Sequence, residues 1–455
     1  MSDTIAAIAT PPAPSAIGIL RLSGPQSIAV LDRVFTPARG APMLERPDRM
    51  LVYGTLRGTD SSVIDHCLAT VSRAPHSYTG EDTAELQCHG SPTLLTMGLE
   101  ALFAAGARQA LAGEFTRRAF LAGKLDLTRT EAVADLIHAQ SPAAVRQAAG
   151  QLGGALANSI DDIYDGLTDL MAHFHAVLDY PDEDIEPFEA EEMARSLTTA
   201  AQKLDRLAAS YRRGRGLVEG IPCAIVGRPN AGKSTLFNAL VGYDRAIVTP
   251  IAGTTRDTVE ERLNLGGILL RLIDTAGLRE AEDRVEQLGV ERSRAAVEQA
   301  ELVLVVLDGS HPFTAEDEDG LALGLSAPHC IVIENKSDLP GASPIPPLPE
   351  QVPLVRLSAL TGDGLDVLER AIEGLFPEDT GLRPGSLLTN ARQAEAAGRA
   401  RQAVSRAADA LSMGLSPDAV LSDVEEALTA LGELTGRLVR EDVTARIFER
   451  FCVGK

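Results

Sequence analysis

Short apolar runs alternate with amphipathic stretches along residues 1–120. The runs typical of strands are Thr4–Thr10, Gly18–Leu22, Met50–Leu56 and Ala84–Cys88. Pro25–Phe35 and Pro92–Ala105 predict helices, because proline fits the first turn of a helix, where its missing N–H has no partner to lose. We therefore expect an N-terminal α/β domain over residues 1–120.

Two later blocks have helical periodicity. Residues 125–211 are rich in Ala, Leu, Asp and Glu, and Pro181–Asp184 interrupts them, which predicts two long helices. Residues 388–450 show a similar periodicity. Because an amphipathic helical block leaves its apolar face in water when it stands alone, we expect the two blocks to pack together. The helical domain would then have two parts, residues 121–215 and 379–455, with another domain inserted between them.

The inserted segment, residues 216–378, follows Arg212–Gly216 and ends near Phe376–Gly385. Its apolar runs are of the kind expected when both faces of a strand are buried. They are Ile221–Val226, Ile268–Ile273, Leu302–Leu307, Ile331–Ile333 and Leu354–Leu357. Helical segments alternate with these runs, which predicts a doubly wound, mainly parallel sheet.

This segment contains one phosphate-binding motif. Residues 227–234, Gly-Arg-Pro-Asn-Ala-Gly-Lys-Ser, lie between a predicted strand and a helix at Thr235–Leu240. The glycines let the backbone wrap a phosphate, and the helix N-terminus supplies further N–H groups. Lys233 is expected to reach the β- and γ-phosphates and Ser234 to bind Mg²⁺. The residues expected to contact the nucleotide here are Asn230, Ala231, Gly232, Lys233, Ser234 and Thr235.

Three further motifs follow in order and identify the base. Asp274-Thr275-Ala276-Gly277 comes after a strand, so that Asp274 can reach the Mg²⁺ shell and the Gly277 N–H can sense the γ-phosphate. Asn335-Lys336-Ser337-Asp338 follows a later strand, and the Asp338 carboxylate can accept the N1 and N2 hydrogens of guanine, a donor pair that adenine lacks. Ser358-Ala359-Leu360 would support the guanine O6 through a backbone N–H. The segment is therefore predicted to be a Ras-like P-loop domain that hydrolyses GTP.

Hydrolysis needs a further group. Gly253–Asp257 lies where switch I belongs, and Thr255 is the candidate that closes over the γ-phosphate and completes Mg²⁺ coordination. Leu278 follows Asp-Thr-Ala-Gly, where Ras-like enzymes place a glutamine that orients water, and an aliphatic side chain cannot do this. The residues that follow in the predicted switch II include Arg279, Glu280, Glu282, Asp283 and Glu286. Residue chemistry alone does not choose among the acidic ones.

The composition adds several limits. The 455-residue chain has a formal net charge of −22, so any RNA is expected to be held mainly by a more basic partner. No apolar run reaches the roughly 18–20 residues of a membrane-spanning helix, and the N-terminus lacks the features of a signal peptide, which favours a cytoplasmic protein.

The five cysteines include no Cys-x-x-Cys pair, so we expect neither a zinc site nor a disulfide framework. Those expected to be ordinary buried thiols are Cys67, Cys88, Cys223 and Cys330.

Motifs outside the nucleotide segment add a family resemblance. They are Gly18–Gly24, Tyr78–Asp82, Gly113–Phe120, Lys124–Leu127, Asp179–Glu183 and Phe451–Lys455. Together with the GTP motifs, and over the whole chain, they resemble the MnmE (also called TrmE) family of tRNA modification GTPases. Two places differ from the family's usual pattern: residues 13–16 are Ala-Pro-Ser-Ala where glycines are usual, and Ser91 stands where a second glycine often follows His89-Gly90.

The resemblance implies a homodimer formed by the N-terminal domains, with a tetrahydrofolate site in that domain. The positions that match the family's folate contacts are Arg21, Glu85, Lys124 and Lys455. The folate, a 5-formyl or 5,10-methylene derivative, would donate the one-carbon unit for C5 of wobble uridine 34 in certain tRNAs, which receives a carboxymethylaminomethyl or aminomethyl group. The resemblance also implies a heterotetramer with the FAD-binding protein MnmG (GidA), which would hold the flavin and most of the tRNA.

The resemblance further implies hydrolysis that depends on K⁺ and on two G domains meeting face to face. The positions that match the potassium site are Asn230, Thr249, Ile251 and Thr254, within a switch I loop of nucleotide-contacting residues Thr249, Pro250, Ile251, Ala252, Gly253 and Thr254. A monovalent cation there would do the electrostatic work of an arginine finger. Glu286 matches the family's water-orienting glutamate, and Arg256 and Arg279 match switch arginines. Cys452 lies in a tail motif that points towards the folate site, and we expect it to have a functional role that the sequence does not assign.

A ribosome-assembly GTPase that acts as a binding switch is the alternative. Such proteins share the G domain but carry an RNA-binding module or tandem G domains. This sequence has a single P-loop motif, no Gly-x-x-Gly RNA clamp in a suitable context and an acidic balance. These features favour the tRNA modification enzyme.

Overall fold

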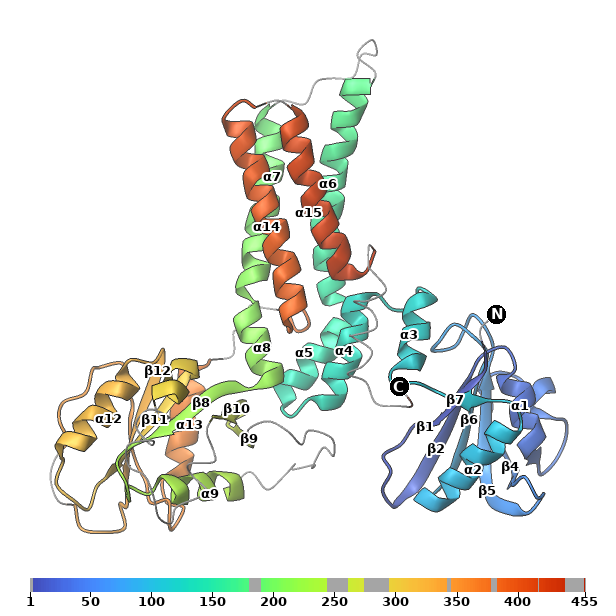
Figure 1. Ribbon diagram of the computed structural model, residues 1–455, viewed down its shortest axis with the longest axis horizontal. Coiled ribbons are helices and arrows are strands. Elements are labelled where there is room, and N and C mark those ends of the chain that lie inside the picture. Colours follow the sequence, from blue (N-terminus) through green and yellow to red (C-terminus); the bar gives the residue numbers. More distant parts are fainter. Residues whose placement is uncertain are drawn as a thin grey trace. The chain divides into compact units, whose positions relative to one another are not determined.

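The chain folds into two compact units, each with its own sheet (Figure 1). The computed structural model describes residues 3–179, 190–243, 261–273, 294–341, 345–377, 383–415, 417–437 and 454. The first unit comprises residues 1–134, 151–200 and 399–455, and the second comprises residues 135–150 and 201–398. Within the described ranges, no helix is both long and apolar enough to cross a membrane.

The N-terminal residues of the first unit form a seven-stranded sheet. Its strands are β1 (Ile5–Ile8), β2 (Ser15–Ser23), β3 (Phe35–Pro37), β4 (Val52–Arg57), β5 (Val63–Ser72), β6 (Thr83–Gly90) and β7 (Arg108–Gln109). Their order is β3-β4-β5-β6-β2-β1-β7; β1 and β7 pair in parallel and the other neighbours are antiparallel. The four predicted strands are confirmed as β1, β2, β4 and β6. Strand β2 begins at Ser15, three residues earlier than predicted.

The apolar pattern does not predict β5, because Asp65 occupies one of its inward positions. The buried Asp65 carboxylate accepts hydrogen bonds from the backbone N–H groups of His66 and His89, at 2.8 and 2.9 Å. It also lies 2.8 Å from the Nδ1 atom of His89. A polar residue is therefore stable inside this strand through contacts that the local sequence pattern does not encode.

Helices α1 (Ser27–Val34) and α2 (Pro92–Ala104) cover one face of this sheet (Figure 1). Their apolar sides form one buried cluster with strand residues such as Leu20 and Leu86. As predicted, Pro92 lies in the first turn of α2, and the Ser91 side chain caps that helix by accepting the Leu94 N–H. Because side chains alternate along a strand, the residues next to Leu20 and Leu86 belong to the opposite face of the sheet. A short 3-10 helix, η1 (Met43–Glu45), follows β3.

The predicted helical blocks contain more helices than their composition suggests. Helix α3 (Glu114–Leu121) precedes the first block. The first block contains α4 (Leu127–His138), α5 (Pro142–Leu152), α6 (Ala155–Asp179), α7 (Ala190–Ala209) and the start of α8 (Tyr211–Glu219), and the second contains α14 (Ala391–Ser412) and α15 (Pro417–Thr435). Ser141-Pro142 and Gly154, with a φ of +95°, divide the stretch expected to be one long helix. Helix α15 packs against α6, so the two blocks meet as expected. Arg406 of α14 pairs with Asp423 of α15 at 2.8 Å.

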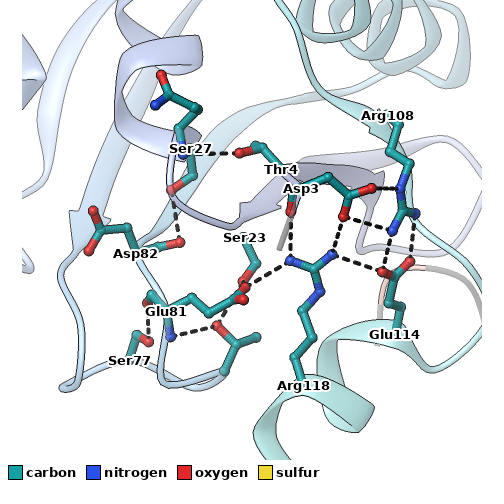
Figure 2. A network of polar contacts seen from close by, with 12 residues as sticks. Asp3, Thr4, Ser23, Ser27, Ser77, Glu81, Asp82, Arg108, Glu114 and Arg118 are labelled. Carbon is teal, nitrogen blue, oxygen red and sulfur yellow. Dashed lines mark hydrogen bonds and ion pairs between the residues drawn. The ribbon is translucent and has the colours of Figure 1, made fainter. Parts of the chain in front are cut away.

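Charged side chains join the N-terminal residues to helix α3 (Figure 2). The Glu114 carboxylate accepts hydrogen bonds from Arg108, from Arg118 and from a backbone N–H. Arg118 also donates to Glu81 and to Asp3, both at 2.9 Å, and Asp3 pairs with Arg108 as well. Burial alone would raise the pKa of Glu114, but these donors outweigh burial and hold the pKa at about 2. The network fixes the first residues of the chain, strand β7, the loop before β6 and α3 in one arrangement.

The second unit is built on a six-stranded sheet. Its strands are β8 (Ile221–Val226), β9 (Glu261–Leu265), β10 (Ile268–Leu272), β11 (Leu302–Asp308), β12 (His329–Asn335) and β13 (Leu354–Arg356). The order is β13-β12-β11-β8-β10-β9, and all neighbours are parallel except β9 and β10. Leu304 of β11 packs with helices α9 (Lys233–Tyr243) and α13 (Leu365–Leu375), whereas the adjacent Val305 packs with α12 (Ala315–Leu325). The sheet is therefore doubly wound and mainly parallel, as predicted (Figure 1).

The chain enters this sheet through α8 and leaves it through residues 383–390. The sequence places a boundary near Gly214 and Gly216, but α8 continues through both glycines. A Cβ at position 214 would lie 2.1 Å from the Leu388 carbonyl oxygen, so glycine allows the departing chain to touch the helix. The Ser210 Oγ accepts the Leu388 N–H at 3.1 Å, which joins the entry and exit segments.

We expect Glu114→Gln to destabilise the first unit by about 2 kcal/mol, because it weakens charge-assisted hydrogen bonds at a buried site. The folded pKa of Glu114, about 2, lies below its ordinary value of 4.5, so the carboxylate's contribution is complete above about pH 5 and disappears as the pH falls towards 2. Thermal denaturation of the full chain should therefore show a gap between wild type and variant that closes on acidification. Glu100→Gln, at an exposed position of α2, is the matched control. A gap that stays constant from pH 7 to pH 3 would contradict this account.

Candidate nucleotide site

The phosphate-binding motif forms a closely packed loop between β8 and α9. Gly227 has a φ of +149°, and a Cβ there would lie 2.3 Å from the Val306 carbonyl oxygen. Gly232 has a φ of +100°, and a Cβ there would lie 2.1 Å from the Nδ2 atom of Asn335. Asn230 also adopts a left-handed conformation, with a φ of +62°. Only glycine fits the first two positions, which is why the motif requires it.

The Lys233 side chain turns back into this loop. Its Nζ atom donates to the carbonyl oxygens of Gly227 and Arg228, at 2.7 and 2.8 Å. Burial lowers the pKa of Lys233. Helix α9 begins at Lys233, two residues before the predicted start, so Ser234 and Thr235 lie in its first turn, where free N–H groups favour an anion. The Lys233 ammonium and the N-terminus of α9 therefore both place positive charge at the phosphate loop.

Asn335 links the phosphate loop to the two segments predicted to bind guanine. Its buried side chain donates from Nδ2 to the Ala231 carbonyl oxygen, and its Oδ1 accepts the Ala359 N–H, both at 2.9 Å. Residues 231, 335 and 359 follow or end strands β8, β12 and β13, whose carboxyl ends share one edge of the parallel sheet. Ligands of such sheets bind at this edge. One amide therefore holds three predicted binding segments together.

Of the residues predicted to contact the base, Asp338 and Leu360 are exposed, whereas Ser358 and Ala359 are buried. Asp338 is exposed, in the turn that follows β12. Ser358 is buried, and its backbone N–H donates to the Asp363 carbonyl oxygen at 2.9 Å. The Leu360 side chain is 79% exposed. A carboxylate in solvent beside a loop held by hydrogen bonds is suited to accept donors from a planar base.

A buried carboxylate that the sequence motifs do not mark lies beside Lys336. Asp308 ends β11, and its Oδ2 accepts a hydrogen bond from the Lys336 Nζ at 2.7 Å. Burial alone would raise the pKa of Asp308, but donors from Lys336 and Ser310 outweigh it and hold the pKa well below its usual range. The rule that functional groups gather where parallel strands end could have identified it, since it directly follows the apolar run Leu302–Leu307.

A second predicted site lies in the other unit, on the face of the N-terminal sheet opposite to Leu20 and Leu86. Arg21 and Glu85 are cross-strand partners on β2 and β6, and the Arg21 Nε lies 2.8 Å from a Glu85 carboxylate oxygen. The two side chains are 26% and 28% exposed. The Arg21 guanidinium also lies 5.9 Å from the ring centre of Phe115. Lys124 is exposed, and its stem lies near Gly80, in the loop before β6.

The end of the chain returns to this part of the first unit. Gly454 is buried with a φ of +100°, and a Cβ there would lie 2.4 Å from the Ile8 carbonyl oxygen of β1. The Arg21 Nη1 donates to the Gly454 carbonyl oxygen at 3.5 Å. Gly454 and Arg21 are therefore neighbours although 433 residues separate them.

Known proteins match the chain over its full length. The sequence model described as MnmE helical domain matches residues 127–452, and that described as GTP-binding protein TrmE N-terminus matches residues 4–124. The tRNA modification GTPases MnmE of Chloroflexus aurantiacus and Symbiobacterium thermophilum are 44% and 43% identical over 100% of this chain, and the matches cover 100% and 99% of those proteins. The Akkermansia muciniphila protein of the same name is 45% identical over 99% of both chains. This chain belongs to the MnmE family of tRNA modification GTPases.

Membership of the MnmE family confirms GTP hydrolysis as the predicted reaction. It also confirms the predicted architecture, in which a TrmE-type N-terminal part and a helical domain accompany a P-loop domain. Four cysteines are buried free thiols, as expected.

Several predicted site residues of this MnmE-family chain fall outside the described residues. They are Thr249, Pro250, Ile251, Ala252, Gly253, Thr254, Thr255, Arg256, Asp274, Thr275, Ala276, Gly277, Arg279, Glu286, Cys452 and Lys455. Their roles stay predictions. The described residues bring together the phosphate loop, residues 335–338 and residues 358–360, and separately Arg21 with Glu85.

We expect Asn335→Ala to weaken GTP binding at least about tenfold, because it removes two hydrogen bonds and leaves two buried backbone groups without partners. Asn335→Asp is the matched variant: it keeps an acceptor for the Ala359 N–H but places a buried carboxylate oxygen against the Ala231 carbonyl, so it should weaken binding at least as much. Titration with a fluorescent GTP analogue measures both. Equal affinities of wild type and Asn335→Ala would show that this linkage does not support the site.

Proposed function

We propose that this chain is a K⁺-stimulated GTPase that acts with the FAD-binding protein MnmG (GidA) on tRNA. Together they would add a carboxymethylaminomethyl or aminomethyl group to C5 of wobble uridine 34, with a tetrahydrofolate derivative as the one-carbon donor. The observation that carries the proposal is the full-length match to proteins named tRNA modification GTPase. The two candidate sites supply the chemistry that such a reaction needs.

In the nucleotide site, the described residues suit a Mg²⁺-bound triphosphate. Lys233 would neutralise charge on the β- and γ-phosphates, and the Ser234 hydroxyl would hold Mg²⁺ together with Thr255. Asn230 is exposed at the tip of the loop and its amide oxygen is a suitable ligand for K⁺. Thr249, Ile251 and Thr254 would complete that shell, where K⁺ would stabilise charge that develops on the phosphates during hydrolysis.

In the N-terminal sheet, Arg21 and Glu85 suit a folate. A guanidinium binds the carboxylates of a glutamate tail, and a carboxylate accepts the amino and ring N–H donors of a pterin. Both side chains are about one quarter exposed, so they can exchange part of their mutual ion pair for contacts with a ligand. Lys124 and Lys455 would add positive charge for the same tail.

The proposed partners come from the family resemblance, and the charge of the chain favours a more basic protein as the main holder of the tRNA. With a formal net charge of −22, the chain is poorly suited to attract an RNA backbone by itself. We infer that MnmG holds most of the tRNA and the flavin, within a heterotetramer built on a homodimer of this chain. The proposed location is the cytoplasm.

Deletion of the gene for this chain should leave wobble uridine 34 without its C5 substituent in the affected tRNAs. Mass spectrometry of nucleosides from total tRNA measures this directly. The wild-type gene should restore the modification, and a gene that encodes Lys233→Ala should not, because the phosphate loop would lose its cation. Normal modification in the deletion strain, together with incompletely assembled ribosomal subunits, would instead support a ribosome-assembly GTPase.

GTP hydrolysis should be faster in K⁺ than in Na⁺ at equal ionic strength, because the proposed cation site supplies positive charge at the phosphates. Glu286→Ala should reduce hydrolysis at least about a hundredfold, the scale for losing a group that acts in the transition state, while GTP still binds. Phosphate release measures the hydrolysis rate in each salt and in the Glu286→Ala variant. Nucleotide titration measures whether that variant still binds GTP. Equal rates in both salts would remove the potassium assignment, and a fully active Glu286→Ala variant would remove the role of Glu286.

A further inference from the structure

A buried carboxylate lies between the two nucleotide-binding loops of the second unit. The Asp308 side chain is 4% exposed, and it accepts hydrogen bonds from the Lys336 Nζ at 2.7 Å and from the Ser310 Oγ and N–H at 2.6 and 3.0 Å. The Nδ1 atom of His311 lies 3.2 Å from the same carboxylate. Asp308 is thus held in one orientation by its own loop, with Lys336, which directly follows the neighbouring strand β12, as its partner.

The same carboxylate faces the phosphate loop. The Arg228 Nη2 atom lies 3.7 Å from the Asp308 Oδ2, and the Arg228 Nε lies 3.1 Å from an Asp317 carboxylate oxygen. Among the described residues, neither of these Arg228 atoms has a partner with hydrogen-bond geometry. The Nε and Nη2 atoms of Arg228 are therefore held between two buried carboxylates mainly by charge.

Each of the two cations belongs to a segment that the nucleotide needs. Arg228 directly follows Gly227, and its carbonyl oxygen binds the Lys233 ammonium. Lys336 has a left-handed φ of +63° and lies two residues before Asp338, the predicted guanine contact. A change at Asp308 would remove a charge partner of both cations at once. A change at Asp317 would affect Arg228 and the capping contacts of Asp317 with Thr314, but not Lys336.

We propose that Asp308 is a positioning residue that couples the phosphate loop to the guanine-binding loop, by holding Arg228 and Lys336 with one buried carboxylate. The inference rests on the proposed nucleotide site. It adds that discrimination of the base depends on a side chain that does not touch the nucleotide.

The test compares Asp308→Asn with Asp317→Asn in the full chain. Asparagine keeps the size of the side chain and an acceptor for Ser310 but removes the charge. We expect Asp308→Asn to raise the Kd for both GTP and GDP at least about tenfold, the scale for losing a charge-assisted hydrogen bond, and to raise KM much more than it lowers kcat. Asp317→Asn should lower thermal stability to a similar degree but raise these Kd values by less than about threefold.

Base discrimination separates positioning from a merely structural role. ITP lacks the 2-amino group that Asp338 is expected to accept, so wild type should bind GTP more tightly than ITP. This preference should shrink in Asp308→Asn and persist in Asp317→Asn. Lys336→Met, which removes only the ammonium, should reproduce the smaller preference, and the double variant with Asp308→Asn should lose little more. If Asp308→Asn does not fold, Lys336→Met alone decides the matter through the same ratio.

Two results would overturn the inference. One is that the ratio of ITP affinity to GTP affinity in both Asp308→Asn and Lys336→Met equals the ratio in wild type. The other is an equal loss of GTP affinity in Asp308→Asn and Asp317→Asn, which would indicate general destabilisation of the fold. Failure of the proposed nucleotide site itself would differ from both, because wild type would then bind ATP as well as GTP.

Discussion

The phosphate loop keeps its shape because the backbone at Gly232 leaves room for the amide of Asn335. A Cβ at position 232 would lie 2.1 Å from the Asn335 Nδ2, the same atom that donates to the Ala231 carbonyl oxygen. Since the other end of this amide accepts the Ala359 N–H, the loop predicted to wrap phosphate and the loop predicted to support the base are both bonded to one buried side chain. Anything that moves the end of β12 moves both. The stability of the site thus depends on the packing of the second sheet, whose central strands are buried on both faces.

The sequence motifs were sufficient to predict this candidate site because each motif is a short, local segment. Each motif directly follows a strand, and in a parallel sheet the carboxyl ends of the strands meet at one edge. The pattern could not show how the motifs are joined. Asp308 lies outside every motif, and its partner Lys336 is 28 residues away along the chain. Strand β5 was missed for a related reason, because part of what stabilises the buried Asp65 is the His89 N–H of the neighbouring strand β6.

The N-terminal site could be named only by resemblance. Arg21 and Glu85 are 64 residues apart, and nothing in their local sequence indicates that the register of β2 and β6 places them opposite each other. The motifs that carry the resemblance contain residues of two kinds. Arg21 and Glu85 are partly exposed and able to bind a ligand, whereas Glu114 and Arg118 are paired with other parts of the first unit (Figure 2). Glu114 and Arg118 hold α3 in place, and α3 carries Phe115, which lies beside the Arg21 guanidinium.

The tail motif shows how a steric and a chemical requirement can occupy adjacent positions. Gly454 has a left-handed φ and lies against the Ile8 carbonyl, so any side chain there would force the tail away from β1. Its own carbonyl oxygen is within reach of Arg21. A glycine at this position therefore allows the end of the chain to lie close to the folate candidates. The steric requirement at Gly454 can be argued from its backbone alone, and it explains why the motif Phe451–Lys455 includes a residue with no side chain.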